Sequence, residues 1–431
     1  MSGLNIDHGG AIAVDTTQLR ELAERVRAVV PVCAEVEESV ERVEALLGSA
    51  AWTPLASAAW SLRSAVMAVQ TLTARVHETA ADLDLMAEVY EVVELRARAE
   101  VLSHTDAAAA AAVEARLRLL LAADERLAPL ADLQERTADE RRFRGLGDQF
   151  DAGGLLPPMF LGGAVVGVTS GLGRVRPGML LGATADPVRV SAASHSRPAG
   201  APSGLASAFR RMPSASGAQV AIEKYTVPGE SPRYVAYVSG SRSMSLREGG
   251  GVEAWDMKSN IELYTGGRSA SYQATLDALA AAGARPGDRV DVVAHSQGGM
   301  IAAHLAMESA FTVTTQITAG SPVEPTLSAD QTLVQLRHTD DVVSALAAGG
   351  AREGTGSADS FTARRVGDPD PGRQDLALAT HSLESYVETA AMVDASTDPR
   401  AVALDAYWAD LDRAVTVERT EYRAERVLPD P

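Results

Sequence analysis

The stretch DRVDVVAHSQGGMIAAHLAM, residues 288–307, constrains the fold of this 431-residue chain more than any other. A valine-rich run at 290–293 is typical of a buried strand, and residues 300–307 favour a helix. Two glycines separate these segments, which places Ser296 at a tight strand-to-helix turn. Strands that lead directly into helices are typical of α/β proteins.

The residues around Ser296 suit a serine nucleophile. In the pattern small-x-Ser-x-Gly the turn strains the serine backbone, so the residues two before and two after must be small. Ala294 and Gly298 meet this requirement, and the amide of Gln297 is expected to face a developing oxyanion. The alternative is an ordinary serine in a turn, because glycine and serine are common turn residues.

A serine becomes a strong nucleophile only beside a base that a third group orients. Four of the eight histidines lie in the first 200 residues, in the helical region and the loose segment after it. His295 adjoins the serine and His304 lies about 12 Å further along the following helix, so neither is expected to reach the hydroxyl. His381 is the expected base because it precedes a helix after the last predicted strand, and His338 is the alternative.

The acid is expected in the loop after TLVQLRH, where Asp340 and Asp341 are adjacent. Asp340 is assigned the role because it comes first, whereas Asp341 could cap the short helix VVSALAA and is the alternative acid. Ser296, Asp340 and His381 then occur in the order serine, acid, histidine.

Strand and helix signals alternate from residue 219 onward, which predicts a largely parallel sheet covered by helices. The predicted strands are VAIEKYTV, RYVAYVSG, DRVDVVAH, FTVTTQITAG, TLVQLRH and SFTARRV. The loop after the second strand contains Gly240 and Ser241, whose amides are the expected second source of oxyanion donors. A simple Gly-Ser turn is the alternative for that loop.

The N-terminal region is predicted to form two long helices that pair as an antiparallel hairpin with a kink at Pro31. The first apolar stripe is Leu19, Leu22, Val26, Val29, Cys33, Val36, Val40, Val43 and Leu47. The second is Leu62, Val66, Val69, Leu72, Val76, Leu83, Met86 and Tyr90. Cys33, the one cysteine, is therefore a residue of the helix interface rather than a reactive thiol.

Shifts in composition predict four regions. They are a helical hairpin or bundle at 1–144, a Gly/Pro/Ser-rich linker at 145–217, a catalytic α/β domain at 218–395 and a helical segment at 396–431. The uncharged stretch 155–173 contains too much glycine and proline for a good spanning helix, so an interfacial or buried linker is favoured.

Charge and composition narrow the classes of partner. A net charge of −18 and a pI near 4.9 argue against nucleic acid and against electrostatic docking on anionic membranes. A single cysteine excludes an intramolecular disulfide, and no metal-ligand spacing is present, so no cofactor is expected. The N-terminus lacks the basic and apolar regions of an ordinary secretory signal, so export would need another route.

The C-terminal region resembles actinobacterial α/β-hydrolases of the lipase and esterase type over about residues 234–391. The resemblance rests on WDMKSNIELYTGG, on the serine turn with its flanking helices, on VTTQITAGSPV, on HTDDVV and on THSLESY. The chain departs from the family at Ala294, where glycine is usual, and at Asp341, Val342 and Val343 after the assigned acid, where Pro-Val-Pro is usual. The resemblance implies a serine hydrolase acting on carboxylic esters, with lipid esters as the favoured class.

The N-terminal hairpin resembles the Trp-X-Gly helical-hairpin substrates of type VII secretion. Trp52 lies in the predicted turn, and Tyr90 and Glu94 match the family's Tyr followed four positions later by an acidic residue. The turn lacks the family's glycine, and Tyr90 as an interface aromatic with Glu94 as a solvated charge is the alternative. The resemblance implies a secreted lipase-type effector or toxin, with small helical-hairpin secretion partners and an immunity protein. The other interpretations are a catalytically silent binding protein and an intracellular esterase with a helical oligomerisation domain.

Overall fold

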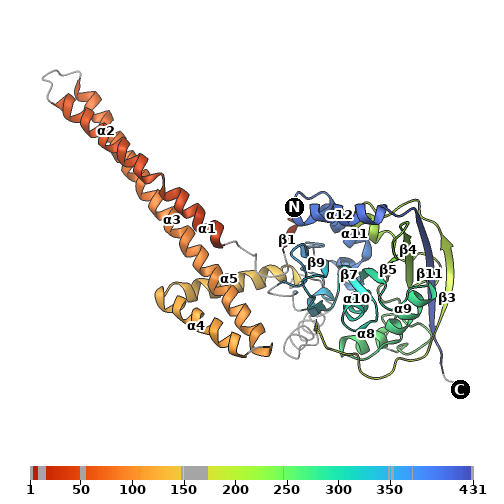
Figure 1. The fold of residues 1–431 in the computed structure, drawn as a ribbon. Coiled ribbons are helices and arrows are strands. Elements are labelled where there is room, and N and C mark those ends of the chain that lie inside the picture. Colours follow the sequence, from red (N-terminus) through yellow and green to blue (C-terminus); the bar gives the residue numbers. More distant parts are fainter. Residues whose placement is uncertain are drawn as a thin grey trace. The chain divides into compact units, whose positions relative to one another are not determined.

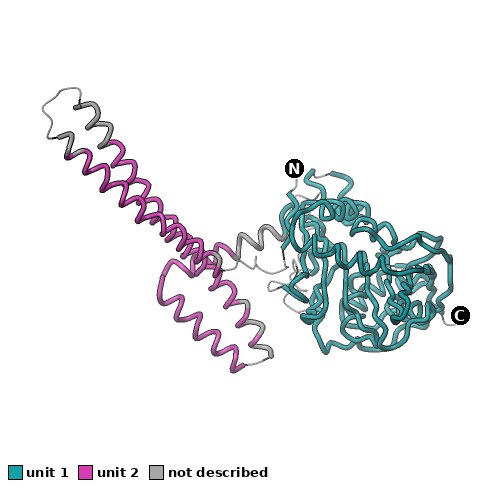
Figure 2. Tube along the Cα trace, turned by 45° about the horizontal axis from the view of Figure 1, so that its top comes forward, with its two compact units in different colours: residues 1–12, 138–431 teal, residues 13–137 magenta. Residues whose placement is uncertain are grey.

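The computed structural model divides the chain into two compact units (Figure 2). Unit 1 contains Met1–Ile12 and Ala138–Pro431, and unit 2 contains Ala13–Thr137. The helical unit is therefore an insertion after a short N-terminal strand, and the predicted domain start at residue 1 is wrong. The described residues are 3–7, 16–48, 55–105, 107–146, 149, 173–245, 247–347, 350, 354–370 and 372–428.

Unit 2 consists of long helices, as the apolar stripes predict. They are α1 (Thr16–Arg27), α2 (Val30–Gly48), α3 (Leu55–Thr105), α4 (Ala107–Ala123) and the first part of α5 (Leu127–Arg142). α1 and α2 run antiparallel to α3, and Arg20 pairs with Glu91 across this interface at 2.6 Å (Figure 1). The helix break at Pro31 is confirmed, because α1 ends at Arg27 and α2 begins at Val30.

The interface between α1–α2 and α3 is narrower than the predicted stripe. Ala23 and Cys33 are buried, with Val26 and Val40 half-buried beside them. Four other positions of the predicted stripe are between 43% and 45% exposed, namely Leu22, Val29, Val36 and Val43. One neighbouring helix covers only part of so wide an apolar face, so half of the predicted stripe is wrong as an interface.

Unit 1 is an α/β structure around a nine-stranded sheet in the order β1-β10-β9-β7-β6-β5-β4-β11-β3. The predicted strands correspond to β4 (Val220–Thr226), β5 (Arg233–Val238), β6 (Arg289–His295), β7 (Thr312–Ala319), β9 (Thr332–His338) and β10 (Phe361–Arg365). Five adjacent strands of the sheet, β10, β9, β7, β6 and β5, are parallel to one another. The remaining strands pair antiparallel, so the sheet is mixed.

Three strands of this sheet were not predicted from the sequence. They are β1 (Asn5–Asp7), β3 (Val188–Ser196) and β11 (Thr416–Arg426). The expected linker at 145–217 is therefore wrong in part, and so is the expected helical segment at 396–431, where α12 (Pro399–Asp412) is followed by β11. β3 lies at the sheet edge and is largely exposed, so it lacks an apolar run. β11 contains buried charges, of which Arg419 pairs with Glu223 of β4 at 3.1 Å.

Helices cover both faces of the sheet (Figure 1). The remaining helices of unit 1 are α7 (Leu205–Phe209), α8 (Met257–Tyr264), α9 (Ala270–Ala281), α10 (Gln297–Glu308) and α11 (Leu383–Asp394). Val292 packs in a core with residues of α8, α9 and α10, whereas its neighbour Val293 packs in a second core with residues of α7, α11 and α12. Alternate residues of β6 thus face different helical layers, which explains why Val292, Val293 and Ala294 are all apolar.

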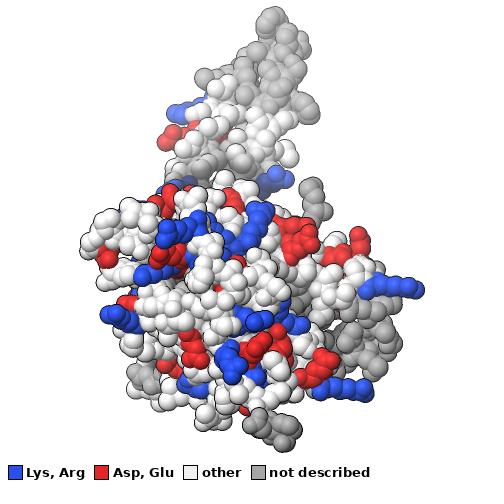
Figure 3. Space-filling model, turned by 90° about the vertical axis from the view of Figure 1, so that its right-hand side faces the viewer, with Lys and Arg blue, Asp and Glu red and all other residues white. Residues whose placement is uncertain are grey.

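Short elements complete unit 1. β2 (Arg174–Val175) pairs with β8 (Glu324–Pro325) in a separate ribbon, and three 3-10 turns follow at Ser344–Ala347, Arg373–Ala377 and Ala379–His381. Within the described part of the chain, no helix combines the length and apolar character that a membrane crossing requires. The apolar stretch 155–172 lies outside the described residues. Lys and Arg are intermixed with Asp and Glu on the face shown in Figure 3.

Candidate active site

The predicted strand-to-helix turn at Ser296 is confirmed. β6 ends at His295, α10 begins at Gln297, and Ser296 between them has φ 53° and ψ −120°. A non-glycine residue rarely adopts positive φ, and the strain is held by a hydrogen bond from the Ser296 amide to the Ala319 carbonyl at 2.9 Å. A Cβ at Gly298 would overlap the Val238 carbonyl, so only glycine allows this close approach of helix and strand.

His381 lies beside the serine, as the sequence predicts. Its Nε2 is 2.7 Å from Oγ of Ser296, and it ends the 3-10 turn directly before α11. Ser382 caps α11, because its Oγ accepts a hydrogen bond from the Ser385 amide at 3.2 Å. Gly320, at φ +59°, makes room for the imidazole, since a Cβ there would lie 2.9 Å from Cε1 of His381.

The acid that contacts His381 is Asp341, and the assignment of Asp340 is wrong. Oδ2 of Asp341 is 2.7 Å from Nδ1 of His381. The carboxylate of Asp340 instead accepts the amides of Gly367 and Asp368 at 2.7 and 2.8 Å, so it holds the loop after β10. Adjacent residues leaving a strand point to opposite sides, and the second aspartate is the one that faces the histidine.

Asp341 also holds the turn that leads into the 3-10 turn at Ser344–Ala347. Its Oδ1 accepts the amide of Val343 at 2.9 Å, while Oδ2 contacts the histidine. The two roles use different oxygens of one carboxylate. They are therefore compatible, and the sequence offered no reason to expect both in one residue.

The surroundings of Asp341 keep it ionised. Burial opposes ionisation, but the charge of His381 and the hydrogen bonds from His381 and Tyr386 outweigh it and lower the pKa of Asp341 to about 2. The Tyr386 hydroxyl lies 2.7 Å from Oδ2 of Asp341, and burial followed by this negative charge raises its pKa well above the ordinary value. Tyr386 is thus a neutral donor at physiological pH.

His295 fixes the backbone of His381 rather than the serine hydroxyl. Its Nε2 is 2.9 Å from the carbonyl oxygen of His381. Burial, with a smaller effect of His381, lowers the pKa of His295 to about 3, so the ring is neutral and donates this bond. The expectation that His295 does not reach the hydroxyl fits this geometry, but its contact with His381 was missed.

His338, the alternative base, lies behind the acid. Its Nδ1 is 2.7 Å from the Thr380 carbonyl and its Nε2 is 2.7 Å from Oγ1 of Thr389. The ring stacks on Tyr386 with 4.0 Å between centroids and 3° between planes. Burial lowers its pKa to about 4, more than the opposing bond to Thr380 raises it. Both nitrogens have partners, so His338 supports Tyr386 and is not placed to accept a proton from Ser296.

The predicted oxyanion donors lie on two sides of the serine. Gln297 is the first residue of α10, where backbone amides have no partner within the helix. A Cβ at Gly240 would lie 2.9 Å from Cβ of Ser296, so this loop passes directly beside the nucleophile. Oγ of Ser241 accepts a hydrogen bond from Asn260 of α8 at 2.7 Å. Within the described residues, the amides of Gly240 and Ser241 donate no hydrogen bond to the protein.

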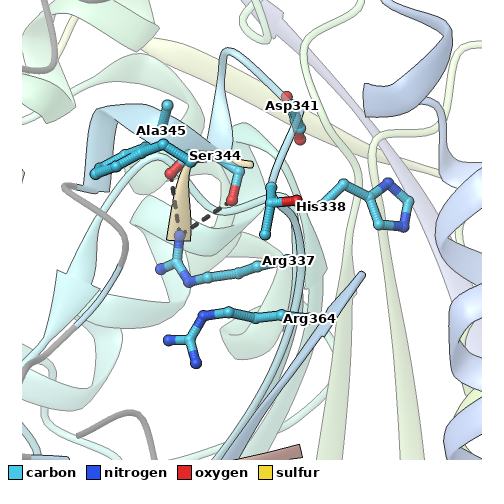
Figure 4. Close-up of a pocket in the computed structure, with 8 residues that line it drawn as sticks. Arg337, His338, Asp341, Ser344, Ala345 and Arg364 are labelled. Carbon is cyan, nitrogen blue, oxygen red and sulfur yellow. Dashed lines mark hydrogen bonds between the residues drawn. The ribbon is translucent and has the colours of Figure 1, made fainter. Parts of the chain in front are cut away.

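A small pocket lies beside the acid Asp341 (Figure 4). Its lining is Phe143, Arg337, His338, Thr339, Asp341, Ser344, Ala345 and Arg364. Arg337 donates to Ser344 at 3.1 Å and pairs with Glu324 at 2.8 Å, and further bonds reach Gln335 and the carbonyls of Ser321 and Val323. These contacts occupy the guanidinium of Arg337. Through its bond to Ser344, Arg337 helps to hold the loop that contains Asp341.

The two residues predicted to serve secretion lie on α3 of unit 2. Tyr90 is half-buried and Glu94 is exposed, four residues apart on one side of the helix. Trp52 lies outside the described residues. This spacing suits either the secretion signal or an ordinary helix surface.

Among the described residues, no group of three His, Cys, Asp or Glu side chains could hold a metal ion. No family model, no curated protein and no solved structure matches this chain. The chemistry of the site therefore has to be argued from its own geometry.

Proposed function

We propose that the chain is a serine hydrolase that cleaves carboxylic esters through an acyl-enzyme. The observation that carries the proposal is the continuous chain of hydrogen bonds from Asp341 through His381 to Ser296, with both bonds at 2.7 Å. A strained serine, a histidine and a buried carboxylate in this arrangement are the parts of a nucleophilic triad. The acid follows β9 and the histidine follows β10, which supports an α/β-hydrolase type of domain.

The proposed reaction follows from these contacts. Nε2 of His381 accepts the proton of Ser296 as Oγ attacks the ester carbonyl carbon, and Asp341 stabilises the resulting imidazolium. The amides of Gln297 and of the Gly240 loop stabilise the oxyanion. His381 then gives the proton to the departing alcohol. A water molecule, activated by the same histidine, releases the acid and restores the serine.

For the biological role we propose a secreted lipase-type effector or antibacterial toxin with lipid esters as substrates. Two features support this part of the proposal, namely the helical hairpin of unit 2 and the Tyr90 and Glu94 spacing on α3. A type VII route would fit them, with a small helical-hairpin partner before export and an immunity protein in the producing cell. No cofactor enters the proposed reaction.

The second candidate is a catalytically silent binding protein. It is favoured by the low exposure of the site, since Ser296 is 8% exposed and His381 is 9% exposed. A hydroxyl so enclosed would admit an ester only after a local rearrangement.

Labelling with a fluorophosphonate probe separates the two candidates. The full chain should be labelled at Ser296, and Ser296→Ala should abolish labelling while leaving the circular dichroism spectrum unchanged. Hydrolysis of short and long acyl esters by the full chain would then identify the substrate class. Equal labelling of the two proteins would overturn the assignment of the nucleophile, and the absence of labelling in both would favour the binding protein.

A further inference from the structure

We propose that Tyr386 is a positioning residue that sets the pH range of activity by sharing one oxygen of Asp341 with His381. The inference rests on the proposed function, because it concerns the base of the same triad. The contact between Tyr386 and Asp341 is additional to the Ser296, His381 and Asp341 contacts of the triad.

The shared oxygen is Oδ2 of Asp341. The Tyr386 hydroxyl and Nδ1 of His381 each lie 2.7 Å from it, while Oδ1 accepts the amide of Val343. The carboxylate thus accepts three hydrogen bonds, two of them on the oxygen that faces the histidine. The hydrogen bond from the phenol partly neutralises the negative charge on this oxygen. Tyr386 therefore reduces the stabilisation that Asp341 gives to a protonated His381.

The direction of the Tyr386 hydroxyl proton is fixed by its surroundings. The side chain is fully buried, and its ring stacks on His338. The backbone amide of His338 donates to the phenol oxygen at 3.2 Å, so the phenol proton is left to point at Asp341. His338 is itself held at both nitrogens by Thr380 and Thr389, which makes the whole arrangement rigid.

The other titratable groups near the triad are neutral or have partners elsewhere, so the contact between Tyr386 and Asp341 is a main influence on the charge that His381 faces. His295 of β6 and His338 of β9 are buried and have lowered pKa values, so both are neutral in the range where esterases work. Asp340 points to the loop after β10. Two cations act electrostatically on Tyr386 and His338, namely Arg337 of β9, which pairs with Glu324, and Arg365 of β10, which contacts Glu388 of α11 at 3.5 Å.

The test is Tyr386→Phe, which removes the hydroxyl and keeps the ring that stacks on His338. With one donor fewer, Asp341 stabilises the protonated imidazole more strongly, so a higher pH is needed to free the base. The acid limb of the rate of fluorophosphonate labelling against pH should move upward by about half to one pH unit. The rate at the alkaline plateau should change less than about tenfold.

Tyr225→Phe is the matched control. Its hydroxyl is also buried and also donates to a carboxylate, Glu223, at 2.6 Å, but this pair lies on β4 and does not contact the triad. Both variants should lose similar stability in thermal unfolding. Only Tyr386→Phe should move the acid limb. Coincident pH profiles for Tyr386→Phe and the unchanged protein would refute the inference.

A second measurement keeps this inference separate from the proposed function. In the proton NMR spectrum of the full chain, the hydrogen between His381 and Asp341 should give a downfield signal that Asp341→Asn abolishes. Tyr386→Phe should shift that signal further downfield, whether or not Ser296 reacts with the probe. If the full chain is not labelled but Tyr386→Phe shifts the signal, only the hydrolase proposal is refuted. If Tyr386→Phe leaves the signal unmoved, the role of Tyr386 is refuted.

Discussion

Replacing Asp341 by asparagine should slow the acylation of Ser296 about 10⁴-fold, because the amide can hold His381 in the wrong tautomer. Nδ1 of His381 lies 2.7 Å from Oδ2, so an asparagine NH2 at that place would donate to Nδ1 and leave the proton on Nε2. Nε2 could then no longer accept the proton of Ser296. A loss of this size corresponds to about 5 kcal/mol of activation free energy.

Asp340→Asn is the matched control one residue away. Asp340 is buried and accepts two backbone amides, and an asparagine can accept only one of them well. Its replacement should therefore lower the free energy of unfolding by about 1–3 kcal/mol. Acylation below the unfolding temperature should fall less than about tenfold.

The assay is the rate of fluorophosphonate labelling at pH 8, followed by fluorescence in gels, with urea unfolding of each variant. Labelling rates normalised to the folded fraction separate chemistry from stability. The geometry would be refuted if Asp340→Asn abolished labelling while Asp341→Asn labelled normally. Equal losses in both would mean that the loop acts as one unit.

Four further predictions follow from other contacts. Gly240→Ala should lower the rate of fluorophosphonate labelling at least about tenfold, because the added Cβ would lie 2.9 Å from Cβ of Ser296. The pKa of Asp341 is lowered to about 2, so its ionised carboxylate stabilises the folded state by about 2 kcal/mol above pH 4. This contribution is lost as the pH falls toward 2. Urea unfolding of the unchanged protein and of Asp341→Asn at several pH values would measure it. Val36→Glu should change the unfolding free energy of unit 2 by about 0.5 kcal/mol or less, whereas Ala23→Glu should cost more than about 3 kcal/mol by the same measurement. Tyr90→Ala should abolish export to the culture medium if the α3 signal acts, and unchanged secretion would count against it.

The central strands and the serine turn could be predicted from local sequence. The residues of β6 that face the two cores are apolar because both faces of the strand are covered, and the small residues beside Ser296 are required by the strained backbone. These signals depend on residues close together in the chain. They need no knowledge of the tertiary structure.

The edge strands and the identity of the acid could not be predicted in the same way. β3 is mostly exposed, and β11 contains charged residues whose partners, such as Glu223, lie about two hundred residues away. Choosing between Asp340 and Asp341 requires the direction of a side chain after the last strand residue, which changes with each step along the chain. The same limit applies to the hairpin, where Val36 is exposed although its spacing suits an interface.

Tyr386 had no sequence signal that would single it out. It lies five residues after His381, in the first turns of α11, and an aromatic residue at that place is expected in the core. Only the contact with Oδ2 of Asp341 distinguishes it. A rule that looks for a tyrosine within about two helical turns of a catalytic histidine would have found it.

The pairing of β1 with β10 affects the order in which the chain can fold. Residues 5–7 are synthesised before the other strands of the sheet, yet Asp7 pairs with Arg364, 357 residues later. At the other edge β11, the final strand, inserts between β3 and β4. Contacts so distant in the chain form slowly, and a vectorially synthesised chain cannot close these two edges until β10 and β11 have been made. During synthesis the helices of unit 2 can form from local contacts alone, long before the triad residues have been assembled.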